Sequence, residues 1–269
     1  MTTSLRSWYW LAIGVYSGIL AGILFWPSLP LPSWPSSHIA WNMYASVHGV
    51  CAQMHNTTIA GQQLPLCARN TGIYGAMTLS MLVMLIAGRH RYTQYGAKVY
   101  TILLMVPIVF LGIDGLNSLS VDIGLTPLYQ PQNWLRMVTG SLAGIAIAPF
   151  FIPTLNRVLR NNGSNHAMIG RWWDLAGLWA IALGYAALTI AGPSWVYWPI
   201  AIISWVGIVG ILLISNTFAV AVAAGYDQRK ISHLTELVKP FLVATLITAI
   251  ELGIMAWLRF GFEASGFAQ

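Results

Sequence analysis

The chain has 269 residues, of which 57% are hydrophobic and only 7% are charged. Charged residues make up about a quarter of an ordinary soluble domain, so this composition excludes that class. The formal net charge of +6 does not indicate nucleic-acid binding, because the basic residues lie in short segments between apolar runs and form no basic stripe. The expected surroundings of the chain are therefore a lipid bilayer.

Seven apolar segments follow one another along the chain, and a spanning helix needs about 20 mostly apolar residues. The segments are residues 8–26, 72–87, 99–119, 134–152, 172–191, 196–223 and 241–258. They predict an all-α, polytopic membrane helical bundle with about seven transmembrane helices. We expect a single transmembrane domain over residues 1–269, in which residues 172–259 form a three-helix extension.

The basic residues predict the orientation of the bundle, because cationic loops stay preferentially on the cytoplasmic side. With the N-terminus inside, only Arg69, Arg136 and Arg259 of the 13 lysine and arginine residues fall on the outer side. This asymmetry indicates a cytoplasmic N-terminus and an outer C-terminus, and it places the 27–71 loop outside.

The 27–71 loop carries both cysteines of the chain. It begins with a proline-rich stretch that favours an extended path, and residues 37–56 are expected to form a short interfacial helix. A disulfide between Cys51 and Cys67 is the economical prediction for an exported loop. The alternatives are free or redox-active thiols, or a metal or cofactor site, since His48, Cys51 and His55 recur at three- and four-residue spacing.

Small residues at four-residue spacing mark two of the predicted spans. Gly14, Gly18 and Gly22 lie on the first span, and Gly140 and Gly144 lie on the fourth. Such spacing lets two helix backbones approach closely in lipid. We expect these glycines to pack helices within the chain, and the alternative is that they contact other membrane subunits.

Ionisable and polar residues gather at a similar depth on the outer side. Arg69 precedes the second span, Asp114 and Asn117 lie in the third, and Arg136 begins the fourth. An unpaired charge in the membrane costs about 2.5 to 3.5 kcal/mol on insertion scales, so Asp114 is expected to meet an arginine. The group predicts either a structural ion pair or a polar pocket for a headgroup, an ion or a proton. Glu251 in the last span either lines the same pocket or forms a separate site.

Residues 65–74, Pro-Leu-Cys-Ala-Arg-Asn-Thr-Gly-Ile-Tyr, resemble the signature of a prokaryotic membrane family known as domain of unknown function 2085. Similar elements are Cys-Ala-Gln at 51–53, Ile-Asp-Gly at 113–115 and Asn-Trp-Leu-Arg-Met-Val-Thr-Gly at 133–140. The resemblance covers about residues 44–150, which we treat as a family-like core. It implies a location in a prokaryotic cytoplasmic (inner) membrane. It also implies one outer cluster that groups Cys51, Cys67, Arg69, Asp114 and Arg136.

The chain departs from this family at two positions. Asn70 replaces the second cysteine of the signature, and Ala52 replaces a histidine. If family members bind a metal through those groups, this chain has lost two ligands, and Cys51 and Cys67 are left as a natural pair. We include Asn70 and Tyr74, which follow Arg69, in the polar cluster.

No catalytic motif is visible, since the sequence lacks a metalloprotease motif, an acidic doublet and a recognisable pair of nucleophile and base. No cofactor is required. Three hypotheses follow. The first is an accessory or structural subunit of a larger membrane complex. The second is a transporter of a small ion or solute that uses Asp114, Arg136 and Glu251. The third is a membrane enzyme or binding protein for a lipid or isoprenoid at the outer leaflet.

Overall fold

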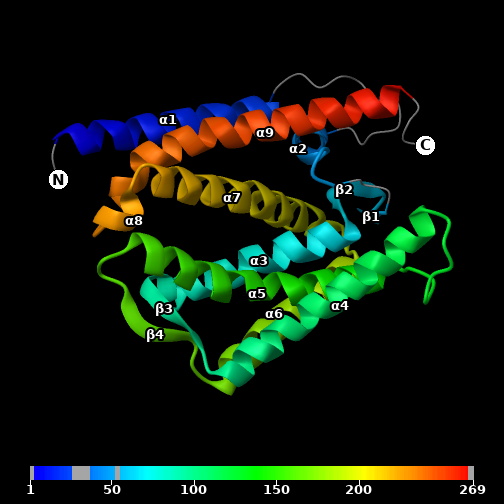
Figure 1. Cartoon of the computed structure of the whole chain (residues 1–269). Helices are drawn as coiled ribbons and strands as arrows, with labels where there is room; N and C mark the ends of the chain where they lie inside the picture. Colours follow the sequence, from blue (N-terminus) through cyan, green and yellow to red (C-terminus); the bar gives the residue numbers. More distant parts are fainter. Residues whose placement is uncertain (1–2, 26–36, 52–54, 266–269) are drawn as a thin grey trace. The chain divides into compact units, whose positions relative to one another are not determined.

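The computed structural model describes residues 3–25, 37–51 and 55–265, most of which are helical (Figure 1). Its long helices coincide with the seven predicted apolar segments. They are α1 (Thr3–Phe25), α3 (Ala68–Ile86), α4 (Lys98–Asp122), α5 (Asn133–Leu159), α6 (Trp172–Ala191), α7 (Tyr197–Ala223) and α9 (Val238–Ala264).

Five helical segments of the described chain are long and apolar enough to cross a membrane, judged by length and composition. They contain α4, α5, α6, α7 and α9, whereas α1 contributes a shorter apolar stretch, Trp10–Ile19. The prediction of a helical membrane protein is confirmed. The count of seven spans and the orientation stay predictions.

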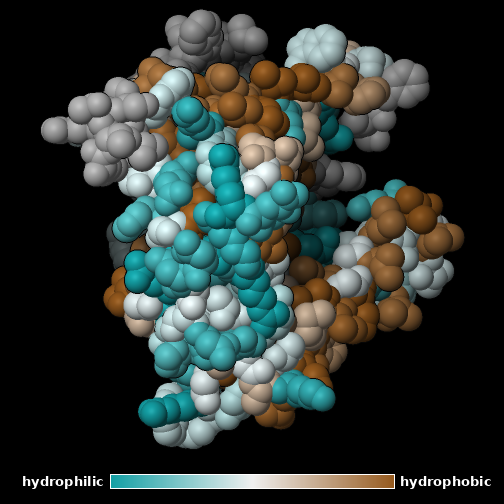
Figure 2. Space-filling view, turned by 60° about the vertical axis from the view of Figure 1, so that its left-hand side comes forward, coloured by the Kyte–Doolittle hydropathy of each residue, from teal (hydrophilic) through white to brown (hydrophobic). Residues whose placement is uncertain are grey.

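The helices present large apolar side chains outward, as expected for contact with hydrocarbon. Ile86 is 82% exposed, Leu116 68% and Trp257 74%. Exposed apolar surface on this scale is unfavourable in water, but it carries no cost in lipid. Figure 2 shows one face of the molecule, on which both hydrophilic and hydrophobic residues reach the surface.

The described chain divides into two compact units that alternate along the sequence. Unit 1 comprises Met1–Ala52, Leu155–Gly163 and Ile208–Gln269, and unit 2 comprises Gln53–Thr154 and Ser164–Gly207. The helices α5 and α7 each contribute residues to both units. The expected single transmembrane domain stays a prediction.

In unit 1, α1 packs against α9 and against α2 (His38–Val47). The Ser37 hydroxyl caps α2 by accepting a hydrogen bond from the Ala40 N–H at 3.4 Å. A short helix was expected within residues 37–56, and α2 confirms it, while the proline-rich stretch before it lies outside the described residues. The unit also contains α8 (Tyr226–Arg229) and the short 3₁₀ helix η3 (Leu234–Leu237).

In unit 2, α3 packs against α5 and α6, and glycines make the close contacts with α5. A Cβ atom at Gly140 would overlap the carbonyl oxygen of Arg69, and one at Gly144 would overlap that of Ile73. Because only glycine leaves this space, α5 can lie directly against the backbone of α3. The expectation that Gly140 and Gly144 pack helices within the chain is confirmed.

The glycines of α1 behave differently. A Cβ atom at Gly14 or Gly18 would meet no atom within 4 Å among the described residues. The expectation that this stripe packs helices within the chain is therefore not confirmed for these two positions. The surroundings of Gly22 lie outside what the structure describes.

Two small sheets accompany the helices, and the all-α prediction did not include them. Strands β1 (Asn56–Ile59) and β2 (Gln62–Cys67) form an antiparallel hairpin, whose turn at Ala60 and Gly61 has positive φ at both positions. Strands β3 (Tyr92–Gly96) and β4 (Ser164–Ile169) pair in parallel. Each strand has six residues or fewer, and the pairing of β3 with β4 joins distant segments. The short 3₁₀ helices η1 (Arg89–Arg91) and η2 (Ser194–Val196) complete the elements.

Candidate functional site

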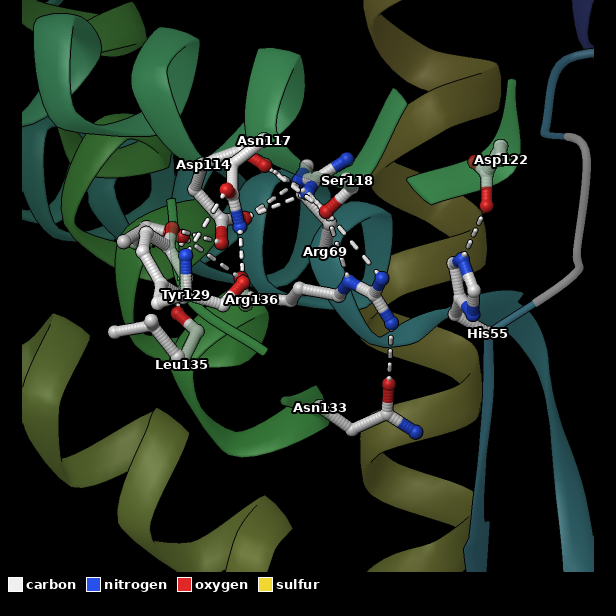
Figure 3. Close-up of polar contacts among 11 residues, drawn as sticks. His55, Arg69, Asp114, Asn117, Ser118, Asp122, Tyr129, Asn133, Leu135 and Arg136 are labelled. Carbon is white, nitrogen blue, oxygen red and sulfur yellow. Dashed lines mark hydrogen bonds and ion pairs between the residues drawn. The ribbon is translucent and has the colours of Figure 1, made fainter. Parts of the chain in front are cut away.

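A buried ion pair joins α3 to α4. Arg69 lies in the first turn of α3, and Asp114 lies in the second half of α4. Oxygen Oδ2 of Asp114 accepts hydrogen bonds from Arg69 Nε at 3.1 Å and from Nη2 at 2.6 Å (Figure 3). Asp114 is only 1% exposed. The carboxylate is thus held inside the bundle by a guanidinium, as a charge in the membrane requires.

Ser118 connects this pair to a second arginine. Its hydroxyl oxygen accepts hydrogen bonds from Arg69 Nη2 at 2.8 Å and from Nε and Nη2 of Arg136, both at 3.3 Å. The same hydroxyl donates to the carbonyl oxygen of Asp114 at 2.9 Å. Ser118 follows Asp114 by one helical turn, so both side chains project from the same face of α4.

Arg136 lies in the first turn of α5, and it is only 4% exposed. Its third hydrogen bond, from Nη1, goes to Asn133 Oδ1 at 3.0 Å. Asn133 in turn donates to the carbonyl oxygen of Asn56 at 3.1 Å, which ties the start of α5 to β1.

Tyr129 closes the cluster from the segment between α4 and α5. Its hydroxyl donates to Asp114 Oδ1 at 2.8 Å. Burial and this hydrogen bond raise the pKa of Tyr129, so the phenol keeps its proton. Asn117 holds the segment in place: its Oδ1 accepts from the N–H of Leu128 at 2.7 Å, and its Nδ2 donates to the Tyr129 carbonyl at 2.9 Å.

We call Arg69, Asp114, Ser118, Tyr129 and Arg136 the Asp114 cluster. It contains two guanidinium groups and one carboxylate, so its formal charge is 2 − 1 = +1. Among the described residues, no carboxylate lies within 4.0 Å of Arg136, and the Nη1 nitrogen of Arg69 makes no hydrogen bond. Arg136 makes three hydrogen bonds, whereas a guanidinium has five N–H donors. The cluster therefore has spare cationic donors.

The helix ends add to this positive character. Both α3 and α5 begin at the cluster, and the N-terminus of a helix carries a partial positive charge. Arginines in the first turn of a helix are not favoured by that dipole. One carboxylate, Asp114, offsets part of the repulsion, and an anion placed beside Arg136 would offset more of it.

His55 and Asp122 lie at the edge of the cluster (Figure 3). His55 Nε2 is 3.5 Å from Asp122 Oδ1, which is an ion-pair distance rather than a well-formed hydrogen bond. Burial and the nearby Arg136 guanidinium lower the pKa of His55 below its usual value. His55 is therefore neutral at pH 7, and Asp122 faces this imidazole instead of an arginine.

An apolar groove adjoins the cluster in unit 2. It has a volume of about 630 Å³ and lies between α4, α5 and α6. Apart from Tyr129, Thr139 and Trp179, the side chains that line it are apolar. Tyr129 belongs to both features, since it lines the groove and donates to Asp114.

Two residues predicted for the cluster have other contacts. Asn70 and Tyr74 follow Arg69 on α3, and the carbonyl of Tyr74 accepts from Thr78 at 2.7 Å. Glu251 belongs to unit 1, where its Oε2 accepts from Asn216 Nδ2 at 2.7 Å. Asn117, as described above, positions the segment that carries Tyr129.

The proposed metal ligands also have separate partners. His48 Nε2 lies 2.9 Å from Glu263 Oε2, and its ring stacks on Phe260 at a centroid distance of 4.3 Å. His55 faces Asp122. Within the described ranges, no group of three or more histidine, cysteine, aspartate or glutamate residues could hold a metal ion.

The predicted disulfide is not confirmed, because Cys51 and Cys67 are not bonded to each other. Cys51 is buried in unit 1, whereas Cys67 ends β2 and precedes α3 in unit 2. The count of cysteines and their place in an exported loop favoured a disulfide, but the bond also requires a specific Cβ geometry.

The sequence did not indicate that Ser118, Tyr129, Asp122 and Asn133 belong to the site. It suggested His55 only as a metal ligand, whereas His55 faces Asp122 at the edge of the cluster. The spacing of four residues between Asp114 and Ser118 was the available signal for Ser118. Nothing in the sequence indicated Tyr129, because its position depends on hydrogen bonds between Asn117 and the backbone of its own segment.

Apolar spanning helices around a buried ion pair define the chain as a multi-pass membrane protein. Residues 51–150 match the family model described as predicted membrane protein (DUF2085), so the predicted resemblance is confirmed. The uncharacterized protein MJ1492 of Methanocaldococcus jannaschii is 28% identical over 113 residues, which cover 41% of this chain and 67% of that protein. No solved structure matches the chain.

The matched region contains the whole Asp114 cluster, from Arg69 to Arg136. The residues that carry the resemblance also have structural roles. Gly72 contacts Met137 and Ser141 of α5, and Gly140 contacts the backbone of Arg69. The shared pattern thus describes the crossing of α3 with α5 and the charges beside it.

Proposed function

We propose that this protein binds an anionic ligand group at the Asp114 cluster, on the outer side of a prokaryotic cytoplasmic membrane. The single observation that carries this proposal is the pairing of the two arginines: Arg69 contacts Asp114, whereas Arg136 is 4% exposed and has no carboxylate within 4.0 Å among the described residues, with Asp114 and Asp122 acting on it from farther away. A buried guanidinium without a carboxylate is costly, and an anion with oxygen acceptors would supply what it lacks.

Ligands of the phosphate or carboxylate class fit these donors. Arginine presents planar N–H groups that match two oxygens of one anion, and spare N–H groups are present on both arginines. Ser118 Oγ already accepts from both guanidinium groups, so it holds them in a fixed arrangement. Binding would therefore require little rearrangement of the side chains, which favours affinity.

The outer placement is part of the proposal, and it rests on the distribution of lysine and arginine. It can be tested in a variant that lacks both native cysteines. A cysteine at Thr126, in the exposed segment after α4, should react with a membrane-impermeant maleimide in intact cells. A cysteine at Asn165, in β4, should react only after the membrane is permeabilised. The opposite pattern would contradict the orientation.

The direct test of anion binding compares lipids that differ only in headgroup charge. Native mass spectrometry of the purified protein should show more retained phosphatidylglycerol than phosphatidylcholine with the same chains. Arg136→Gln should remove this preference because it deletes the buried charge. Arg91→Gln is the matched control, since Arg91 is an exposed arginine of unit 2 outside the cluster. Equal retention of both lipids by the unaltered protein would refute the proposal.

A role as an accessory subunit is a second candidate, and one observation favours it. A Cβ atom added at Gly14 or Gly18 would have no neighbour within 4 Å among the described residues, so this face of α1 has room for another helix. Purification in a mild detergent should then yield a partner in stoichiometric amounts, and replacing both glycines with leucine should release it. A transporter route through Asp114, Arg136 and Glu251 receives less support, because Glu251 bonds to Asn216 in the other unit.

A further inference from the structure

We propose that the ligand is a long-chain amphiphile, whose hydrocarbon chain lies in the groove between α4, α5 and α6 while its anionic group meets Arg69 and Arg136. This inference rests on the proposed function and adds the chemical class of the ligand. It requires that the groove and the cluster be continuous, that the groove have the length of a lipid chain, and that it open toward lipid.

The groove and the cluster meet at Tyr129. Ile113 lines the groove and immediately precedes Asp114, and Leu135 lines the groove and immediately precedes Arg136. Tyr129 lies at the junction, with its ring on the groove and its hydroxyl on Asp114. Figure 3 shows Tyr129 and Leu135 beside the charged side chains. Tyr129 is the only cluster residue among the described residues that line the groove, and the proposal requires the ligand's charge to reach the arginines past its hydroxyl.

The length of the groove matches one leaflet of a bilayer. On α4 its lining runs from Leu103 to Ile113, and ten residues of helix rise about 15 Å. The hydrocarbon core of a bilayer is about 30 Å thick, so the groove spans about half of it. A chain anchored at the cluster would then extend past the midpoint of α4 toward its N-terminal end.

The groove is open at the side. Val106 is 41% exposed and Phe110 is 58% exposed, although both line it. A lipid could therefore enter from the surrounding leaflet without passing through water. The apolar lining excludes a second charged group along the ligand's hydrocarbon chain, because such a group would have no partner in the groove.

The charge of the cluster favours an anionic headgroup of low charge. Its five residues carry a formal charge of +1, from two arginines and one aspartate, and the Asp122 carboxylate at its edge offsets part of that charge at Arg136. A phosphodiester carries one negative charge and presents oxygens to both guanidinium groups. We therefore assign the ligand to the class of single-charge amphiphiles with a chain of leaflet length.

The test measures binding of methyl alkyl phosphodiesters with chains of increasing length, and of dimethyl phosphate as the anion without a chain. The protein is kept in a neutral maltoside detergent, and affinities are measured by isothermal titration calorimetry. We expect the dodecyl compound to bind tighter than the butyl compound by about tenfold or more, because each buried methylene adds affinity.

Val106→Trp should abolish this gain with chain length, since the indole would fill the groove. The matched control is Val109→Trp, because Val109 is 61% exposed on the same helix and does not line the groove. A chain that carries a diazirine near its end gives a second measurement on the unaltered protein. It should label peptides that contain Leu103 or Leu183.

Three outcomes would overturn the inference. In the first, binding is independent of the length of the alkyl chain, while Arg136→Gln still weakens the binding of dimethyl phosphate. The proposed anion site would then stand, and the proposal of an amphiphilic ligand would fail. If Val106→Trp and Val109→Trp behave alike and the diazirine labels other segments, the chain lies elsewhere. If chain length matters but Arg136→Gln changes nothing, the compounds only adsorb to apolar surface, and the proposed function fails as well.

Discussion

Arg69 and Asp114 are 45 residues apart in the chain, and their side chains meet at 2.6 Å inside the bundle. The pair fixes the start of α3 against the second half of α4. Arg136, the other arginine at this depth, does not contact a carboxylate among the described residues. It donates instead to the Ser118 hydroxyl, which also accepts from Arg69. The unequal pairing of two arginines with one aspartate is the basis of the proposed anion site.

Replacing Asp114 should destabilise the protein strongly. Asp114→Asn leaves the half-buried Arg69 guanidinium without its carboxylate and removes a negative charge near the buried Arg136, and breaking a buried pair costs about 3 to 5 kcal/mol. Thermal unfolding in detergent should show a lower midpoint. In Arg69→Gln/Asp114→Asn part of the loss should be recovered, because the uncompensated charge is removed. Additive effects of the two substitutions would show that the ion pair is not coupled.

Gly144→Ala should destabilise the packing of α5 against α3. The new methyl group would overlap the carbonyl oxygen of Ile73, and overpacking typically costs about 1 to 3 kcal/mol. Gly112→Ala is the matched control on α4, where a Cβ meets no atom within 4 Å among the described residues. That control should be neutral or slightly stabilising, because alanine favours helix. Equal unfolding midpoints for the two variants would contradict the predicted contact.

His55 should make stability depend on pH. Its pKa is lowered in the folded protein, so the unfolded chain binds more protons than the folded one as the pH falls below the usual histidine value of about 6.5. Stability should therefore decrease on acidification from pH 7.5 to 5.5. His55→Gln should show a smaller decrease in the unfolding midpoint over the same range. A decrease of the same size in both proteins would exclude His55 as the cause.

Asn117 should control the order of the segment that carries Tyr129. Asn117→Ala removes the hydrogen bonds to the N–H of Leu128 at 2.7 Å and to the carbonyl of Tyr129 at 2.9 Å. Hydrogen exchange of Leu128 and Tyr129 should then become faster, while the middle of α4 keeps its protection. If exchange in this segment is unchanged, Asn117 is not what positions Tyr129.

The helices were predictable because long apolar runs report directly on the cost of placing polar groups in lipid. The residues of α4 and α6 were located in this way to within a few positions at each end. The sheets were not predictable, since β3 and β4 are short, lie in separate loops and pair across the segment that contains α4 and α5.

At the site, the charge of Asp114 was enough to predict that it meets an arginine. The sequence did not distinguish Arg69 from Arg136 as the partner, because both lie in the first turn of a helix at similar depth. That choice depends on how α3 and α5 cross, which the glycine contacts determine. Glu251 was grouped with this site only because the sequence predicted a similar depth in the membrane.

The buried charge of Arg136 is the centre of the proposed anion site. The dissociation constant of methyl dodecyl phosphodiester should be measured by calorimetry for the unaltered protein, for Arg136→Gln and for Arg91→Gln. Loss of one hydrogen-bonded charge pair in a buried site should weaken binding by about tenfold or more in Arg136→Gln, with little change in Arg91→Gln. Equal affinities for all three proteins would contradict the proposal that the Asp114 cluster binds an anion.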